Sequence, residues 1–178
     1  QRQMCIRDRY GVLQSPRLLE IFSHGTDAVK EHITEVVAES VQIKADYVAN
    51  DEFDTGVRRY LNLGHTIGHA IERSAKYRLM HGHCVAIGMV MISRAGEALG
   101  ITEAGTTEQL IAICEKNSLP VSCDFSTKTL LDGALSDKKR TGGNIALIIP
   151  EKLGKCMTHT VPVEELEHII DSGKETSV

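Results

Sequence analysis

The sequence predicts a mainly α-helical domain that carries one small β-hairpin. Apolar residues recur at spacings of three and four along most of the 178 residues, which is typical of amphipathic helices. Strand character is clear only at residues 144–161, where two short apolar segments flank a turn. The sequence has no internal repeats and no low-complexity linkers, so we expect one domain.

Two helices are expected in the first third of the chain. Ser15 is a candidate N-cap, Pro16 occupies the first helical position, and Gly25 follows the predicted end of the first helix. The second helix is predicted over residues 26–51. Its apolar stripe has helical spacing and consists of Val29, Ile33, Val36, Val37, Val41 and Val48.

The middle of the chain predicts three further helices. A polar loop that turns at Gly56 leads into a helical segment rich in histidine and glycine. A strongly apolar helix follows from about His81 to Leu99. Thr106 and Gln109 form a capping-box pattern at the start of the next helix.

The C-terminal third contains the predicted hairpin. Residues 127–140 predict a short helix that leads into a basic, glycine-rich turn, Arg140 to Gly143. The segments 144–150 and 155–161 then flank the turn sequence EKLG and predict two paired strands. Residues 163–173 predict a final helix, and we expect the residues after it to be frayed.

Composition excludes several classes of protein. Hydrophobic residues make up 42% and charged residues 25% of the chain at a net charge of −4, so we expect a soluble protein without a nucleic-acid or membrane surface. The longest apolar run, Cys84 to Ile92, is much shorter than the roughly 20 residues that span a bilayer. No signal peptide is readable at the start. Five scattered cysteines without a C-x-x-C pair indicate a reducing compartment, so we expect a cytoplasmic location and no disulfides.

The stretch GHTIGHA places two histidines where they can act together. On a helix, His65 and His69 project from one face and can approach one metal ion or one substrate. Gly64 and Gly68 have the same spacing and leave a strip open to a ligand or to another backbone. The alternative is a glycine-lined helix crossing with two structural histidines.

A second pair of histidines, His81 and His83, follows at the start of the apolar helix. A helix–loop–helix return would bring His65, His69 and His81 together. Three imidazoles fit a divalent-metal site that lacks one protein ligand or leaves room for a substrate. The alternative is a surface cluster of histidines.

Basic residues at three places are candidates for anion binding. Lys44 shares a helix face with the apolar stripe, so we expect it to be buried and directed at an anionic ligand, unless its tip reaches solvent. Arg58 and Arg59 precede the histidines, and residues 138–140 are all basic. Such clusters are usually solvated, but convergence on the histidines would make a phosphate or carboxylate pocket.

Three segments together resemble the 3-dehydroquinate synthase family, specifically its C-terminal domain. They are residues 43–72, 81–91 and 137–156, in the family's order. The first contains the block R-x-x-x-N-x-G-H-[TS]-x-G-H-A-x-E, and H-G follows it. The resemblance implies a family domain over residues 10–178, with residues 1–9 outside the family pattern and the N-terminal NAD-binding domain absent.

The resemblance implies a lyase of the shikimate pathway. The family converts 3-deoxy-D-arabino-heptulosonate 7-phosphate into 3-dehydroquinate and phosphate, with transient use of NAD. A divalent metal, zinc or cobalt, polarises the substrate's oxygens and is held by one Glu and two His. The resemblance also implies a cytoplasmic enzyme that forms a homodimer at full length.

The resemblance assigns roles to individual residues. His65 and His81 match the two metal-binding histidines, and His69 matches a histidine placed for proton transfer to or from the substrate. The glycines beside them would let the substrate lie close to the helix. The positions that match substrate-binding residues are Lys44, Arg58, Asn62 and either Lys138 or Lys139.

The start of the chain departs from the family pattern Glu-x-x-Lys-Tyr-Gly. Ile6 stands at the position of the metal-binding Glu, and Arg9 stands at the position of the Lys. Asp8 lies two residues further on, about 200° around a helix, and does not replace the Glu simply. His83 occupies a position that is often Glu. We therefore expect the chain alone not to turn over.

Two alternatives to this function stay open. Within enzymes, the chain would be a related sugar-phosphate cyclase or a metal-dependent alcohol dehydrogenase of the same superfamily. Outside enzymes, it would be a non-catalytic helical binding domain whose histidines are structural. Metal content after replacement of His65 and His81 separates the second alternative from the enzyme.

Overall fold

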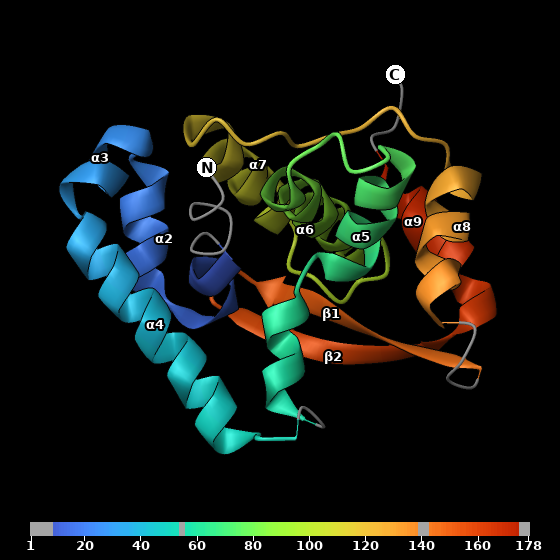
Figure 1. The fold of residues 1–178 in the computed structure, drawn as a ribbon, viewed down its shortest axis with the longest axis horizontal. Helices are drawn as coiled ribbons and strands as arrows, with labels where there is room; N and C mark the ends of the chain where they lie inside the picture. The colour runs from blue at the N-terminus through green and yellow to red at the C-terminus, as the bar shows by residue number, and fades with distance from the viewer. Residues whose placement is uncertain (1–8, 54–55, 139–142, 175–178) are drawn as a thin grey trace.

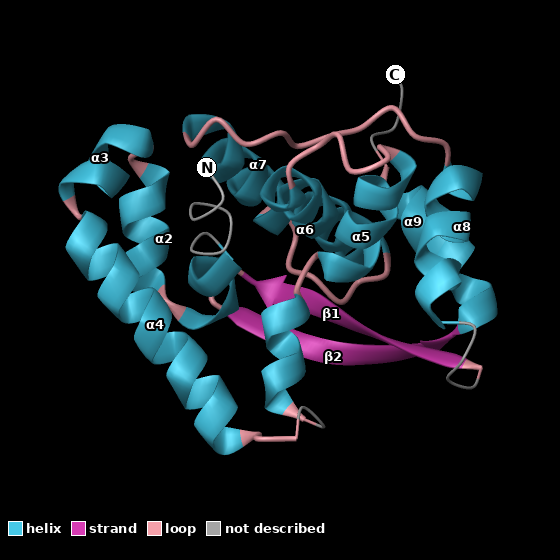
Figure 2. Cartoon of the chain, viewed as in Figure 1, coloured by secondary structure: helices cyan, strands magenta, loops and turns pink. Residues whose placement is uncertain are grey.

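The computed structural model describes residues 9–53, 56–138 and 143–174. Within them, helices surround a long apolar helix, and a two-stranded sheet runs along one side (Figures 1 and 2). The central helix is α6 (His81–Ala98), which is buried over most of its length. It packs against α5 (His65–Ser74), α7 (Thr106–Lys116), α9 (Leu166–Gly173) and β1 (Asn144–Lys152). The predicted mainly α fold is confirmed.

The sheet is the predicted hairpin. β1 pairs antiparallel with β2 (Lys155–Pro162), in a register that runs from Asn144 opposite Pro162 to Pro150 opposite Cys156. Gly154 has φ of +83°, a conformation that glycine adopts at little cost, and it completes the turn. Alternate residues of β1 point into the core, where Ile145, Leu147 and Ile149 are at most 2% exposed.

The N-terminal helices only partly follow the prediction. Residues 9–14 are helical, and α2 (Pro16–Ser23) has the expected cap, in which the Leu18 N–H donates to Ser15 Oγ over 3.0 Å. The single helix predicted over residues 26–51 is wrong. The chain forms α3 (Thr26–Glu31) and α4 (Ile33–Asn50), which meet at His32 with φ −96° and ψ 21°. Apolar spacing continues through the break, so periodicity did not reveal it.

The expected burial of Lys44 is also wrong. α4 buries the side that contains Val36 and Ile43, whereas Lys44 is exposed and Val41 is 62% exposed. The helix carries apolar residues on two sides, and the rest of the chain covers only one of them. In Figure 1, α4 lies at the edge of the molecule, away from α5 and α6.

α5 and α6 cross with their backbones close together, and glycines make this possible. A Cβ added to Gly64 would lie 2.8 Å from the backbone oxygen of Val85, and one added to Gly68 would lie 3.0 Å from the backbone of Cys84. The first distance is shorter than real Cβ contacts allow, and the second is tighter than nearly all of them. The strip beside the histidines is therefore filled by α6, so the expectation that the glycines let substrate approach is wrong. The glycines line a helix crossing, as the alternative had it, but this does not decide whether the histidines are structural.

The remaining elements match the predicted types but not every detail. α7 begins after Gly105, and the predicted capping box is wrong because the Glu97 carboxylate of α6 accepts from the Thr107 N–H over 2.8 Å. α8 (Thr127–Lys138) is the predicted short helix, and most of the basic turn predicted after it lies outside the described residues. Short 3-10 helices, η1 (Val57–Asn62) and η2 (Val163–Glu165), precede α5 and α9.

The described cysteines act as small apolar residues. Cys84, Cys114, Cys123 and Cys156 form no disulfide with one another, as expected. Burial raises the pKa of Cys156 to about 12 and that of Cys84 to about 11, so both thiols stay protonated. In the part of the chain that the structure describes, no helix combines the length and apolar character needed to cross a bilayer.

The α5–α6 crossing predicts the effect of one added methyl group. Gly88→Ala would place a Cβ 2.8 Å from the backbone nitrogen of Gly68. We expect it to lower the free energy of unfolding by about 1–3 kcal/mol or more, against the roughly 0.5–1 kcal/mol gained by Gly→Ala in an unobstructed helix. Urea denaturation measures the change, with Gly143→Ala as control because its Cβ meets nothing within 4 Å. A Gly88→Ala protein as stable as the parent would contradict the packing.

Candidate metal centre

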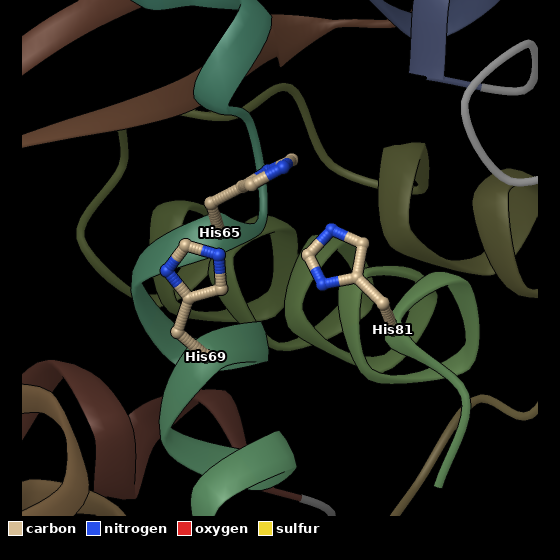
Figure 3. A group of neighbouring side chains, drawn as sticks. All are labelled: His65, His69 and His81. Atoms are coloured by element: carbon tan, nitrogen blue, oxygen red, sulfur yellow. The ribbon is translucent and has the colours of Figure 1, made fainter. Parts of the chain in front are cut away.

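Three histidines converge between α5 and α6 (Figure 3). His65 and His69 lie one turn apart on α5, and His81 is the first residue of α6. Their ring centroids are 5.3 Å, 5.4 Å and 5.5 Å apart, and one nitrogen from each ring lies within 4.8 Å of the others. The predicted convergence is confirmed, whereas the separate roles of the histidines stay predictions.

A tight return between the two helices brings His81 back to α5. The connection includes Lys76 and Tyr77, both with positive φ (50° and 58°), which reverse the chain after the last turn of α5. The Tyr77 N–H donates to the carbonyl of Glu72 over 2.9 Å and closes this reversal. α6 can therefore start beside the first turn of α5, where His65 and His69 lie.

His65 is held as a neutral imidazole with one ring nitrogen directed at the site. Its Nδ1 lies 3.1 Å from the carbonyl oxygen of Leu63, and because a carbonyl only accepts, Nδ1 carries the proton. Nε2 then keeps its lone pair. Burial, followed by the positive charge of Arg9, lowers the pKa of His65 to about 3. Neutral imidazole is the form that binds a metal ion.

His81 is oriented by a carboxylate. Its Nδ1 donates to Oε2 of Glu72 over 3.1 Å, which leaves Nε2 for another partner in the neutral ring. Glu72 follows His65 and His69 on α5 at spacings of seven and three, so all three lie on one helix face. A metal-binding histidine usually donates its second ring N–H to a carboxylate. This contact fixes the ring and makes the nitrogen that faces the metal a better electron donor.

Arg9 contacts the cluster from the helical residues 9–14. Its Nη1 lies 3.0 Å from Nε2 and 3.3 Å from Nδ1 of His65. Because these two distances are nearly equal, Nη1 lies over the ring and not in line with the lone pair of Nε2. Arg9 is only 8% exposed, and its guanidinium carbon lies 5.5 Å from the ring centroid of Tyr10. A buried positive charge therefore lies directly beside the histidines.

A cavity of about 250 Å³ opens beside His65 and His69. Its wall comes from η1, α5, α8 and β1, so four elements that are separate in sequence surround it. This volume suits a small polar molecule rather than a macromolecular segment. The lining residues are Asn62, His65, Thr66, His69, Gly133, Ala134 and Ala146.

The other predicted substrate residues are less closely grouped. Asn62 lines the cavity, as expected for a substrate contact. Arg58 is half-buried in η1 and its Nη1 donates to the carbonyl of Glu52 over 3.0 Å. Lys44 is exposed on α4. Lys138 ends α8 but its side chain is outside the described part, and Lys139 lies wholly outside it.

The cluster fits a divalent metal such as zinc or cobalt. Two imidazoles on one such ion have their nitrogens roughly 3–4 Å apart, so the nitrogens within 4.8 Å need only small side-chain rotations. His65 is neutral, and both His65 and His81 have a partner on the ring nitrogen that faces away. The donor set of nitrogen atoms also suits these metals better than magnesium or calcium.

Sequence reasoning assigned no role to Glu72 and did not foresee the contact of Arg9. Glu72 could have been found, since its spacing from His65 and His69 puts it on their face of α5. The family pattern places Arg9 at a lysine position and predicts no contact with His65. Its contact with His65 joins residues 56 apart in sequence, and no local pattern predicts such a contact.

Comparison with known proteins identifies the family. The family model for the C-terminal domain of 3-dehydroquinate synthase matches residues 8–140, which are most of the chain. The chain belongs to the 3-dehydroquinate synthase family. It is 40% identical to the 3-dehydroquinate synthase of Streptococcus sanguinis over 167 residues, 91% of this chain and 47% of that protein. The Streptococcus suis protein is 42% identical over 163 residues, 89% of this chain and 46% of that protein.

The chain thus spans about half the length of the curated relatives it matches. Solved structures show the same fold at low sequence identity. A 2-epi-5-epi-valiolone synthase from Streptomyces hygroscopicus, solved with NAD+ and Zn2+, is 17% identical with a TM-score of 0.82, over 97% of this chain and 50% of that one. A 2-deoxy-scyllo-inosose synthase with carbaglucose-6-phosphate, NAD+ and Co2+ is 16% identical with a TM-score of 0.77, over 95% and 51%.

The contact between Glu72 and His81 predicts a specific loss of metal affinity. Glu72→Gln replaces a charged acceptor by a neutral one, which weakens the orientation and basicity of the His81 ring. We expect zinc and cobalt to bind about 10–100-fold more weakly. Titration with Co2+, followed by visible absorption and chelator competition, measures this affinity. Glu108→Gln, an exposed acidic residue on α7, is the control. Equal affinities in the two variants would show that Glu72 does not support the site.

Proposed function

We propose that these residues supply the metal- and substrate-binding half of a 3-dehydroquinate synthase. The whole protein would convert 3-deoxy-D-arabino-heptulosonate 7-phosphate into 3-dehydroquinate and phosphate, as a carbon–oxygen lyase of the shikimate pathway. One observation carries the proposal. The histidines of the family motif, His65 and His81, meet across the α5–α6 crossing together with His69.

The metal would be held by His65 and His81. A bound zinc or cobalt ion supplies a Lewis acid for the substrate's hydroxyl and carbonyl oxygens. His65 offers Nε2 because Leu63 takes its Nδ1–H, and His81 offers Nε2 because Glu72 takes its Nδ1–H. Both rings are thereby fixed in the tautomer and orientation that ligation needs.

His69 would exchange a proton with the substrate. It lines the same cavity as His65, and its ring centroid is 5.5 Å from that of His81, so a substrate in the cavity would contact it. A histidine in this position can donate or accept a proton near neutral pH. Asn62, at the cavity wall, would bind a substrate hydroxyl.

Basic residues around the cavity would bind the substrate's negatively charged groups. The proposed set contains Lys44, Arg58 and one of Lys138 and Lys139. Arg58 belongs to η1, the segment that also carries Asn62 into the cavity wall. Arginine and lysine suit a phosphate and a carboxylate because both groups accept charge-assisted hydrogen bonds.

NAD would be bound by residues beyond the matched region. The relatives are about twice as long as this chain, and the two cyclase structures contain NAD+ in chains of which this one covers about half. We therefore expect no turnover by the 178 residues alone. In the full-length protein we propose a cytoplasmic homodimer, as in the family.

A related sugar-phosphate cyclase is the second candidate. The two cyclases named above share the fold with TM-scores of 0.82 and 0.77. A cyclase reaction is therefore the alternative to the dehydroquinate synthase reaction. Sequence identity favours dehydroquinate synthase, at 40–42% against 16–17% for the cyclases. Residues that contact the substrate's phosphate and carboxylate would separate the two, so substrate choice is the decisive measurement.

A chimeric enzyme tests the proposal. The N-terminal half of the Streptococcus sanguinis enzyme would be joined to residues 10–178, and dehydroquinate and phosphate release would be measured with zinc and NAD. We expect turnover by the chimera, none by the 178-residue chain, and losses of about 100-fold or more in His65→Ala and His81→Ala. His24→Ala, on an exposed residue after α2, is the matched control.

Three results would contradict the proposal. Robust turnover by the isolated chain would show that it is not half of an enzyme. A chimera that uses another sugar phosphate, but not 3-deoxy-D-arabino-heptulosonate 7-phosphate, would favour the cyclase alternative. Unchanged metal content in His65→Ala and His81→Ala would favour the non-catalytic binding domain.

A further inference from the structure

A second cavity lies far along α6 from the histidines. Its volume is about 250 Å³, the same as that of the cavity beside His65. This α6–α9 cavity is lined by Met91 and Arg94 of α6, by residues 121–124 and by Lys174, which follows α9. Arg94 lies about three and a half turns of α6 after His81, which is roughly 20 Å along the helix axis. Among the described residues, the two cavities have no lining residue in common.

The end of α9 and the second half of α6 form part of the wall. Gly173, the last residue of α9, packs so closely on α6 that an added Cβ would lie 2.5 Å from the backbone oxygen of Met91. Arg94 follows Met91 on the same face of α6, and its Nη1 donates to the carbonyl of Gly173 over 2.9 Å. This hydrogen bond serves the end of α9, where backbone carbonyls lack helical partners. It also fixes the guanidinium at the cavity, and a guanidinium has further N–H donors for a ligand.

Another part of the wall is a segment that is neither helix nor strand. Residues 121–124 belong to the connection between α7 and α8, which crosses the molecule in Figure 1. Exposure alternates along this segment, with Cys123 half-buried and its neighbours Ser122 and Asp124 exposed. Ser122 therefore offers a hydroxyl group at the cavity, which can donate a hydrogen bond to a ligand.

Positive charge exceeds negative charge in this cavity. Arg94 and Lys174 are half-buried, and within the described part of the chain neither forms an ion pair. Asp124 supplies one negative charge to the described lining. Burial raises the pKa of the Cys123 thiol, while the Phe125 N–H and then the charge of Lys174 act against this rise. Partly buried cations without a partner are costly unless a ligand supplies the opposite charge.

We propose that the α6–α9 cavity binds a small oxyanion, a carboxylate or a phosphate group, at a site separate from the metal centre. Arginine and lysine bind such groups through charge-assisted hydrogen bonds. Arg94 and Lys174 supply the charge, and Ser122 supplies a neutral donor. A cavity of this size suits a small molecule. Because α6, the end of α9 and the α7–α8 connection all contribute to the wall, a bound anion joins them and stabilises the fold.

Titration with inorganic phosphate, and separately with malonate, tests this site by nuclear magnetic resonance. Sodium chloride keeps the ionic strength constant, so that general screening is the same throughout. We expect saturable shifts of the backbone N–H signals of residues 121–124 and of the Arg94 Nε–H signal with at least one probe. The probe that binds more tightly identifies the group that the cavity prefers. Lys174→Gln and Arg94→Gln should each weaken binding by about 10-fold or more, because each removes a charge-assisted hydrogen bond.

A third variant is the matched control. Lys152→Gln removes the same charge from an exposed lysine at the end of β1 and should bind the anion as the parent does. Arg94→Gln keeps a side-chain amide that can donate to Gly173, and Lys174→Gln changes a residue beyond α9, so we expect both to fold. The bound anion should raise the unfolding temperature of the parent and of Lys152→Gln more than that of the two cavity variants.

Two results would overturn the proposal. One is the absence of saturable shifts at residues 121–124 with both anions, even if the ring signals of His65 and His69 move, because the anion would then bind at the histidines. The other is equal affinity of Lys174→Gln, Arg94→Gln and Lys152→Gln, because the two cavity charges would then not contact the anion. Neither result bears on the metal centre, since this inference does not depend on it.

Discussion

The close crossing of α5 and α6 determines where every imidazole of the candidate site lies. Gly64, directly before α5, and Gly68 of α5 face Val85 and Gly88 of α6 so closely that backbone meets backbone. Because the two helices cannot separate without losing this contact, the start of α6 is held beside the first turns of α5. The histidines therefore meet through packing between glycines.

Burial and a neighbouring positive charge keep His65 neutral. The pKa of His65 is lowered to about 3, mainly by burial and next by Arg9. Glu72 supplies a carboxylate behind His81, and the Leu63 carbonyl serves the same purpose behind His65. These contacts leave two nitrogen donors directed at one space, with a guanidinium at its edge. Two imidazole nitrogens held in this way favour a divalent cation such as zinc or cobalt.

Local patterns predicted those parts of the fold that depend on local interactions. The Ser15 cap, the hairpin and the apolar helix starting at His81 all follow from neighbouring residues, and all are present. The break at His32 and the exposure of Lys44 were missed, because they depend on which side of α3 and α4 the rest of the chain covers. Periodicity shows that a helix has an apolar face but does not show what covers it.

In the candidate site too, local sequence patterns predicted some features and missed those set by tertiary packing. The meeting of His65, His69 and His81 followed from one helical spacing and one short return. The glycines were open to two interpretations, and only the distances to Val85 and Cys84 separated them. The approach of Arg9 depends on tertiary packing, so no motif would have placed it.

Anomalous diffraction at the cobalt absorption edge tests the central claim most directly. Crystals of this chain would be grown with one equivalent of Co2+, and the position of the ion would be read from the anomalous map. We predict one strong peak beside Nε2 of His65 and of His81, between α5 and α6. A strong peak elsewhere, with none between these two rings, would contradict the account of the α5–α6 crossing as a metal centre.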